Sequence, residues 1–161
     1  MDNITKKAGK IKLLGTDIDG VWTDSKMYVT PDGEWMKAFS TYDGMATAML
    51  KEKGIIIAIL TGENSDVVIA RTEKLQIDEV YVDEHEKLKR LIYLTKKYDI
   101  TMDEVAYIGD DVNCFELLSN VGIAACPENA MRKIKSIPNI IQLSKSGGEG
   151  VVRELVELIL S

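Results

Sequence analysis

The sequence predicts an α/β fold, with one Rossmann-like domain built on a mostly parallel sheet that carries helices on both faces. Strand-like apolar runs alternate with helical patterns along almost the whole chain, which is typical of a parallel sheet. One run, Ile55–Leu60, is continuously apolar, as expected of a strand covered on both faces. A chain of 161 residues, 45% of them hydrophobic, can form one core and is short for two, so residues 1–161 are expected to form a single domain.

The first half of the chain alternates between turn residues and apolar runs. A run that ends at an aspartate is expected to be the first strand, and two short runs around Pro31-Asp32-Gly33 predict a β-hairpin within residues 26–40. The hairpin is followed by a helical pattern that ends at a glycine. The expected elements are strand Ile11–Leu14, hairpin arms Met27–Val29 and Trp35–Phe39, helix Asp43–Gly54, strand Ile55–Leu60, and a helix from Asn64-Ser65 to Leu75.

The second half repeats the alternation of strand and helix. A capping box at Thr101 to Glu104 predicts one helical turn just before a short apolar strand. A tail over residues 144–161 begins with a glycine-rich segment and ends in an apolar helix; residues 1–10 carry no such pattern and are expected to be disordered. The expected elements are strand Glu79–Val82, helix Glu86–Tyr98, strand Val105–Ile108, strands Gly122–Ala125 and Ile140–Leu143 with a helix between them, and helix Val151–Leu160.

Charge and composition exclude several classes of protein. The net charge is −6, whereas nucleic-acid-binding proteins usually carry a basic surplus, so no nucleic-acid partner is expected. No apolar run approaches the roughly 18 residues that a membrane helix needs, and the N-terminus does not resemble a secretory signal. Cys114 and Cys126 make neither a disulfide scaffold nor a CxxC metal site. These features favour a cytoplasmic protein without a membrane partner.

Three carboxylates follow two strands of the expected sheet. Asp17 and Asp19 come after the first strand, and Asp110 comes after Val105–Ile108. If the backbone stays extended, Asp17 and Asp19 share one face. Clustered carboxylates repel each other unless a cation compensates them, and an all-oxygen set without nearby His or Cys favours Mg²⁺. The alternative is that each aspartate is a turn residue.

An ionised aspartate can also attack phosphorus as a nucleophile. The phosphoryl oxygens then need hydrogen-bond donors and a positive charge. Thr61 and the Gly62 amide follow the Ile55–Leu60 strand and offer donors, and Lys87 at the start of the next helix offers the charge. The spacing of Lys87 alone equally fits a solvated helix lysine.

These residues resemble the four motifs of the haloacid dehalogenase superfamily of phosphatases. The segment Asp17-Ile18-Asp19-Gly20 is similar to the first motif, and Thr61-Gly62, Lys87 and Gly109-Asp110-Asp111 match the other three in order. The short length, the hairpin in place of a cap domain and the glycine-rich tail resemble the capless 3-deoxy-2-keto sugar-acid phosphatases. The resemblance implies a phosphatase fold over the whole chain, a phosphorylated sugar acid as the small-molecule partner, and Mg²⁺ as the cofactor.

The resemblance also implies a role for each motif residue. Asp17 becomes the nucleophile, and Asp19 first protonates the leaving oxygen and then activates water. Mg²⁺ is bound by Asp17, by the main-chain carbonyl of Asp19 and by Asp110. Thr61, Gly62 and Lys87 hold the phosphoryl group, with Asn113 at its edge or near the metal, and Asp111 orients Lys87. Cys114 stands where the family often has Asp, so a supporting role there is open.

Glu63, Arg71 and Lys74 indicate the chemical class of the substrate. Arg71 and Lys74 share a helix face and suit the carboxylate of a sugar acid, and Glu63 suits sugar hydroxyls. The resemblance favours a nine-carbon acid 9-phosphate, with 3-deoxy-D-manno-octulosonate 8-phosphate as the alternative. Without the resemblance, these three residues fit a surface charge cluster equally well.

The residues alone do not specify the oligomeric assembly or the roles of several side chains. Members of this group are typically homotetramers in which a neighbour's hairpin covers each active site, and the resemblance implies the same here. A related domain serves sialic-acid cytidylyltransferases as a non-catalytic oligomerisation module, and a mutase or protein phosphatase is a further alternative. The roles of Glu149 and Arg153, and the placement of Trp22 and Trp35 in core or interface, are not decided by the sequence.

Overall fold

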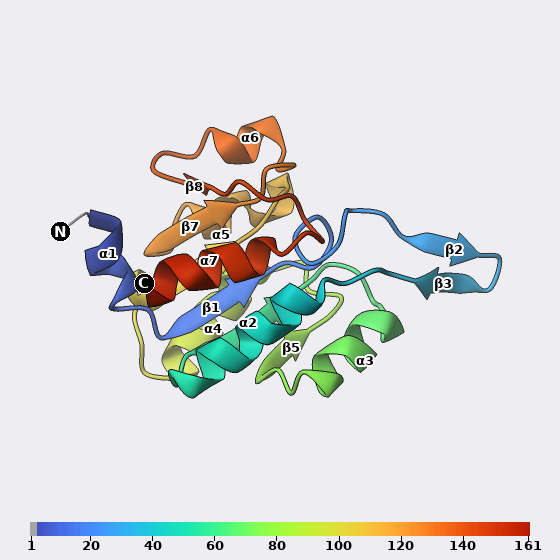
Figure 1. Cartoon of the computed structure of the whole chain (residues 1–161), viewed down its shortest axis with the longest axis horizontal. Coiled ribbons are helices and arrows are strands. Elements are labelled where there is room, and N and C mark those ends of the chain that lie inside the picture. The colour runs from blue at the N-terminus through green and yellow to red at the C-terminus, as the bar shows by residue number, and fades with distance from the viewer. Residues whose placement is uncertain (1–2) are drawn as a thin grey trace.

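The computed structural model describes residues 3–161, and its centre is a six-stranded parallel sheet (Figure 1). The strand order is β5-β4-β1-β6-β7-β8, and every neighbouring pair is parallel. The predicted fold class is therefore confirmed. The strands are β1 (Leu13–Thr16), β4 (Ile56–Leu60), β5 (Glu79–Tyr81), β6 (Val105–Ile108), β7 (Ile123–Cys126) and β8 (Ile141–Gln142).

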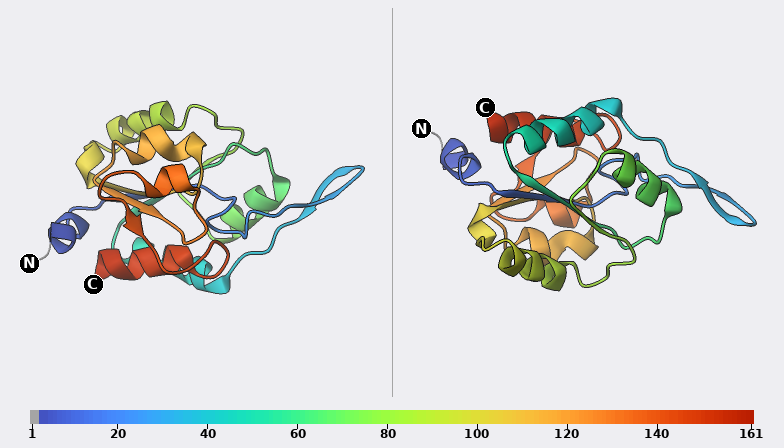
Figure 2. Two further views of the ribbon diagram at one scale, coloured as in Figure 1. Left: turned by 90° about the horizontal axis from the view of Figure 1, so that it is seen from above. Right: turned by 90° about the horizontal axis from the view of Figure 1, so that it is seen from below.

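Helices cover both faces of this sheet, because successive strand side chains point to opposite sides (Figure 2). Leu14 joins a cluster with residues of α1, α2, α3 and α7, while its neighbour Leu13 joins a second cluster with α4, α5 and α6. The two clusters together form the core. The helices are α1 (Asn3–Ala8), α2 (Thr41–Glu52), α3 (Asp66–Lys74), α4 (Lys87–Lys97), α5 (Phe115–Leu118), α6 (Arg132–Lys135) and α7 (Val151–Leu160).

The predicted hairpin is present and projects away from the sheet (Figure 1). Of its antiparallel strands, β2 (Tyr28–Thr30) lies one residue later than the predicted arm Met27–Val29, and β3 (Gly33–Met36) begins and ends earlier than the predicted arm Trp35–Phe39. The hairpin strands leave large apolar side chains in solvent, with Val29 65% and Trp35 66% exposed. Trp22, in contrast, is buried in the core, and its indole nitrogen donates to the Thr16 hydroxyl at 3.0 Å.

The helix starts follow the local capping chemistry. Ser65 caps α3 by accepting from the Val68 amide, and the capping box begins the short 3-10 helix η1 (Met102–Glu104), both as predicted. Helix α2 begins earlier than expected because Ser40, rather than Asp43, is its N-cap. The short helices η2 (Val112–Cys114) and α5 were not predicted, since neither has a full turn of periodic apolar residues.

The N-terminal segment differs from the expectation for residues 1–10. Asn3–Ala8 form α1, whose Lys7 ammonium donates to the Gly122 carbonyl at 3.0 Å, while residues 1–2 lie outside the described part of the chain. No helix within residues 3–161 has both the length and the apolarity required to cross a bilayer.

The sheet register brings the motif residues together. Thr16, the last residue of β1, pairs with Ile59 of β4 and Ile108 of β6. Residues that follow these three strands therefore meet at the carboxyl edge of the sheet, where parallel α/β folds place their ligand sites.

Candidate active site

A polar pocket of about 250 Å³ opens at this edge of the sheet. It receives side chains from the ends of β1, β4 and β6, as the strand register requires. Most of the predicted catalytic and phosphate-binding residues are brought together here. The lining residues are Asp17, Asp19, Ser25, Thr61, Gly62, Glu63, Asp110, Asp111 and Asn113.

An ion pair between Asp17 and Lys87 lies beneath the pocket. The Lys87 ammonium is 2.7 Å from Asp17 Oδ2, and both side chains are almost fully buried. The Ile18 amide donates to the other carboxylate oxygen of Asp17 at 2.8 Å. Burial lowers the pKa of Lys87, but the facing Asp17 carboxylate outweighs it, so the pKa is raised and the lysine is charged. Lys87 is therefore not the solvated helix lysine that spacing alone permitted.

The loop after β1 turns sharply instead of staying extended. The amides of Val21 and Trp22 donate to the Ile18 carbonyl, and Gly20 has a φ of +82°, which favours glycine. A Cβ at Gly20 would also lie 1.8 Å from Asp110 Oδ2. Asp17 and Asp19 thus reach one pocket through a tight turn, and the extended backbone on which the expected alternation depended is not present.

The surroundings of Asp110 disfavour the ionised form of its carboxyl. Burial first, then the charges of Asp17 and Asp111, raise its pKa to about 7 from an ordinary 3.8. No group of three or more His, Cys, Asp or Glu side chains suited to a metal occurs within residues 3–161. The carboxylates of Asp17 and Asp110 still offer only oxygen ligands at the pocket, and the repulsion at Asp110 is what a hard divalent cation relieves. The residues therefore fit Mg²⁺.

The segment after β4 offers unused hydrogen-bond donors. The Thr61 amide donates a hydrogen bond to the Tyr81 carbonyl at 2.9 Å. Among the described residues, neither the Thr61 hydroxyl nor the Gly62 amide donates to a protein atom. Asn113 lines the same pocket from η2. These groups are available to the oxygens of an anion.

Two residues after β6 make contacts that the sequence did not specify. Asp111 accepts from the Val112 amide and caps η2, and its expected role in orienting Lys87 stays a prediction. Cys114 lies against the ion pair, with its sulfur 3.3 Å from Asp17 Oδ2 and 3.5 Å from the Lys87 ammonium. Burial and the Asp17 charge raise the pKa of this thiol, so it stays protonated and donates to the carboxylate.

The three expected substrate residues separate in the structure. Glu63 lines the pocket, whereas Arg71 and Lys74 do not. The Arg71 guanidinium lies 5.8 Å from the ring centre of Phe39, and a Cβ at Gly44 would come within 2.7 Å of it. Helix α3 thus directs Arg71 towards α2, which its spacing from Lys74 in the sequence does not reveal.

The tail supports the pocket without supplying side chains to it. A Cβ at Gly147 would lie 2.2 Å from the Gly20 carbonyl, so the glycine-rich segment packs against the first-motif loop. Arg153 pairs with Glu157 on α7, and Glu149 is exposed. His85 is exposed beside Asp83.

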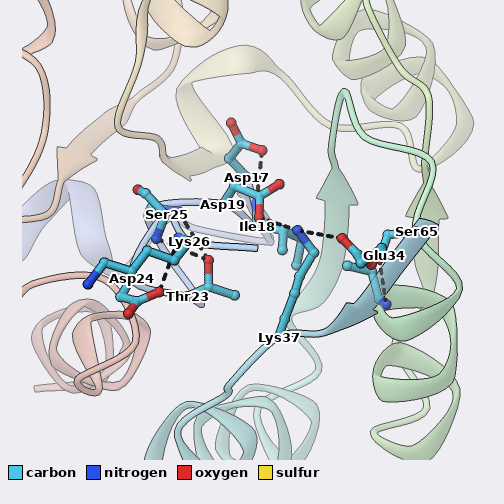
Figure 3. Close-up of polar contacts among 12 residues, drawn as sticks. Asp17, Ile18, Asp19, Thr23, Asp24, Ser25, Lys26, Glu34, Lys37 and Ser65 are labelled. Carbon is cyan, nitrogen blue, oxygen red and sulfur yellow. Dashed lines mark hydrogen bonds and ion pairs between the residues drawn. The ribbon is translucent and has the colours of Figure 1, made fainter. Parts of the chain in front are cut away.

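Lys37 belongs to the site although no sequence motif indicated it. Its buried ammonium lies 2.5 Å from Asp19 Oδ1. Figure 3 marks this contact with a dashed line. The only signal in the sequence is its position at the base of the predicted hairpin.

Comparisons with known proteins agree with this geometry. Residues 51–155 match the haloacid dehalogenase-like hydrolase family. The 3-deoxy-D-manno-octulosonate 8-phosphate phosphatase of Yersinia pestis is 32% identical over 99% of this chain and 84% of its own length. The corresponding Escherichia coli K12 enzyme is 33% identical over 98% of this chain and 84% of its length.

Solved structures extend the similarity to the fold. The Moraxella catarrhalis 3-deoxy-D-manno-octulosonate 8-phosphate phosphatase, in complex with magnesium ion, phosphate ion and KDO, superposes with a TM-score of 0.94 at 36% identity over 99% of this chain and 91% of that one. The cobalt-bound Haemophilus influenzae enzyme gives a TM-score of 0.91 at 32% identity, over 96% and 90% of the two chains. The chain therefore belongs to the haloacid dehalogenase-like hydrolases, as a phosphoric monoester hydrolase of the capless sugar-acid phosphatase group.

Proposed function

We propose that this protein is a Mg²⁺-dependent phosphatase that hydrolyses 3-deoxy-D-manno-octulosonate 8-phosphate. The observation that carries the catalytic part is the buried Asp17–Lys87 pair beneath a pocket that Asp19 and Asp110 also line. The substrate rests on relatives with that activity that match nearly the whole chain. This is the alternative of the sequence analysis. The nine-carbon substrate lost support because Arg71 and Lys74 lie outside the pocket.

Asp17 is the proposed nucleophile. Its carboxylate attacks phosphorus, the P–O bond to the sugar breaks, and an aspartyl phosphate forms. The Lys87 ammonium at 2.7 Å neutralises charge on Asp17 and on the transferred group. The free donors of Thr61, Gly62 and Asn113 bind the phosphoryl oxygens.

Asp19 is the proposed acid and base. It gives a proton to the leaving sugar oxygen and later takes one from the water that hydrolyses the aspartyl phosphate. Its side chain is 27% exposed at the pocket, where both sugar and water have access.

Asp17, Asp110 and the main-chain carbonyl of Asp19 are the proposed ligands of Mg²⁺. When bound, the ion offsets the negative charge that gathers between the carboxylates and the phosphoryl group. Asp110 also brings its own charge close to Asp17, so its raised pKa is the expected mark of this role.

The test is kcat/KM with Mg²⁺ on four compounds: the octulosonate 8-phosphate, a deaminated nine-carbon acid 9-phosphate, N-acetylneuraminate 9-phosphate and p-nitrophenyl phosphate. We expect the octulosonate to be preferred at least about tenfold, or about 1.4 kcal/mol in the transition state. A preference for a nine-carbon acid would overturn the substrate and keep the chemistry. No turnover of any compound would favour the non-catalytic oligomerisation module.

Asp17→Asn provides the control for the chemistry. The amide keeps the shape of the carboxylate but cannot form the aspartyl phosphate, so turnover should vanish while the circular dichroism spectrum is unchanged. Turnover near wild type would disprove the nucleophile.

We also propose a homotetramer in which the hairpin of one subunit covers the pocket of its neighbour. Exposed apolar side chains on a projecting hairpin support this arrangement, because exposed apolar patches mark interaction surfaces. Trp35, 66% exposed, is the largest of them. Light scattering should give four times the chain mass, and Trp35→Asp should reduce it; an unchanged tetramer in that variant would exclude the hairpin from the interface.

A further inference from the structure

A chain of polar contacts connects Asp19 to the hairpin and to helix α3 (Figure 3). Lys37, just after β3, places its ammonium 2.5 Å from Asp19 Oδ1 and 3.1 Å from Glu34 Oε2. The other oxygen of Glu34 accepts a hydrogen bond from the Ser65 hydroxyl. Ser65 is the N-cap of α3. Three separate elements thus hold one lysine ammonium beside the pocket.

The burial of Lys37 indicates that this contact has a defined geometry. Its side chain is 0% exposed, although the carboxylates of Asp19 and Glu34 are 27% and 18% exposed. A lysine is rarely buried unless its charge is paired, because an unpaired buried ammonium is strongly unfavourable. Two carboxylates satisfy that condition here, so the ammonium has little freedom to leave them.

Asp19 has few other constraints. Within residues 3–161, Lys37 is the sole polar partner of its carboxylate, and Oδ2 accepts no hydrogen bond from the protein. Asp19 lies in the turn after β1 and lines the pocket. Proton transfer requires the two heavy atoms to be within hydrogen-bond distance, so an unrestrained Asp19 would spend much of its time in unproductive positions.

We propose that Lys37 is a positioning residue that holds Oδ1 of Asp19 and leaves Oδ2 directed to the reacting oxygen, with Glu34 and Ser65 keeping Lys37 in place. The inference rests on the proposed function, in which Asp19 is the acid and base. As the P–O bond breaks, the proton passes from the Asp19 carboxyl to the sugar oxygen. Lys37 keeps its proton throughout and touches neither phosphorus nor the leaving group.

A comparison of two leaving groups distinguishes a positioning role of Lys37 from a purely structural one. A sugar alcohol leaves poorly without a proton, whereas p-nitrophenolate leaves as a stable anion and needs none. Single-turnover release of the leaving group, with Mg²⁺ and excess enzyme, measures bond cleavage before the aspartyl phosphate is hydrolysed. In Lys37→Met we expect release from the octulosonate 8-phosphate to fall at least about 10-fold, part of the 10²–10⁴-fold that general acids contribute. Release from p-nitrophenyl phosphate should fall less than about 3-fold, because no protonation is required.

Three variants accompany this measurement. Lys37→Arg keeps the charge and the donors, and should restore part of the lost release from the sugar phosphate. Glu34→Gln weakens the contact that keeps Lys37 in place. Its release rate from the sugar phosphate should therefore fall more than its release rate from p-nitrophenyl phosphate, but by less than in Lys37→Met. Lys53→Met removes an exposed lysine at the end of α2 and should change neither rate.

Asp19→Asn separates failure of this inference from failure of the proposed function. Equal losses with both leaving groups in Asp19→Asn would show that Asp19 is not the acid, and the role of Lys37 would fall with it. An asymmetric loss in Asp19→Asn with equal or no losses in Lys37→Met and Glu34→Gln would overturn the inference alone. If Lys37→Met does not fold, as judged by circular dichroism, the arginine and glutamine variants decide the outcome by the same criterion.

Discussion

Removing the charge of Asp110 should stabilise the metal-free protein. The residue is 7% exposed, and burial together with the charges of Asp17 and Asp111 raises the pKa of its carboxyl to about 7 from 3.8. At pH values above 7 the folded protein must therefore hold an ionised carboxylate in an unfavourable place, whereas the unfolded chain ionises it freely. Asn has the same shape without the charge, so Asp110→Asn removes this penalty.

The folded and unfolded pKa values of Asp110 limit the gain in the free energy of unfolding. They differ by about three pH units, which corresponds to about 4 kcal/mol at roughly 1.4 kcal/mol per unit. This figure is an upper bound, since water entry and side-chain rearrangement relax the repulsion. For a chain of this length, 1 kcal/mol shifts Tm by about 2–4 °C, so the gain is at most about 8–16 °C.

The pH dependence has a definite sign. Below about pH 4 the carboxyl is protonated in both folded and unfolded states, so wild type carries no penalty. Between about pH 4 and pH 7 the unfolded chain releases this proton before the folded protein does, and wild type loses stability relative to Asp110→Asn. Above about pH 7 the difference is constant.

The assay is guanidinium unfolding followed by circular dichroism, in EDTA, at about pH 5 and about pH 8. Asp103→Asn is the matched control, because Asp103 is exposed and is not one of the pocket residues around Asp110. Adding Mg²⁺ should stabilise wild type, by about 2.7 kcal/mol at a hundred times Kd, and should not stabilise Asp110→Asn. Equal stability of wild type and Asp110→Asn at about pH 8, or a gap that does not grow with pH, would refute the reasoning.

Three further predictions concern the core and the helix termini. Cys114 and Cys126 are buried and burial raises the pKa of both thiols, to about 11 for Cys126, so neither should react with a disulfide reagent at about pH 8 before unfolding; rapid reaction of the native protein would contradict this. Trp22→Phe should destabilise the protein by about 2 kcal/mol through lost packing and a lost hydrogen bond, whereas Tyr42→Phe on the exposed surface of α2 should change stability by less than about 0.5 kcal/mol in guanidinium unfolding. In Asp43→Ala the free energy of unfolding should fall by about 1 kcal/mol, because one carboxylate oxygen of Asp43 caps α7 by accepting from the Arg153 amide. Asp43→Asn should retain most of that stability, and equal losses in the two variants would exclude capping.

Local patterns were sufficient for most elements because their causes are local. The continuous apolar run predicts β4, the serine and threonine caps predict α3 and η1, and the glycines before the last helix predict the start of α7. The short helices η2 and α5 were missed because tertiary contacts, rather than periodicity, stabilise them; Leu117 and Leu118 enter the core without completing a pattern.

The sequence by itself determined the fold class and the candidate residues that meet at one edge of the sheet, because the strand alternation places the residues that follow β1, β4 and β6 at the carboxyl edge of a parallel sheet. Only the tertiary structure decided which side chains meet there. Arg71 turns to Phe39, Asp111 caps a helix, and Cys114 and Lys37 take up contacts with Asp17 and Asp19. Spacing along the chain specifies the face on which a residue lies, but the direction of its side chain depends on packing between elements that are far apart in sequence.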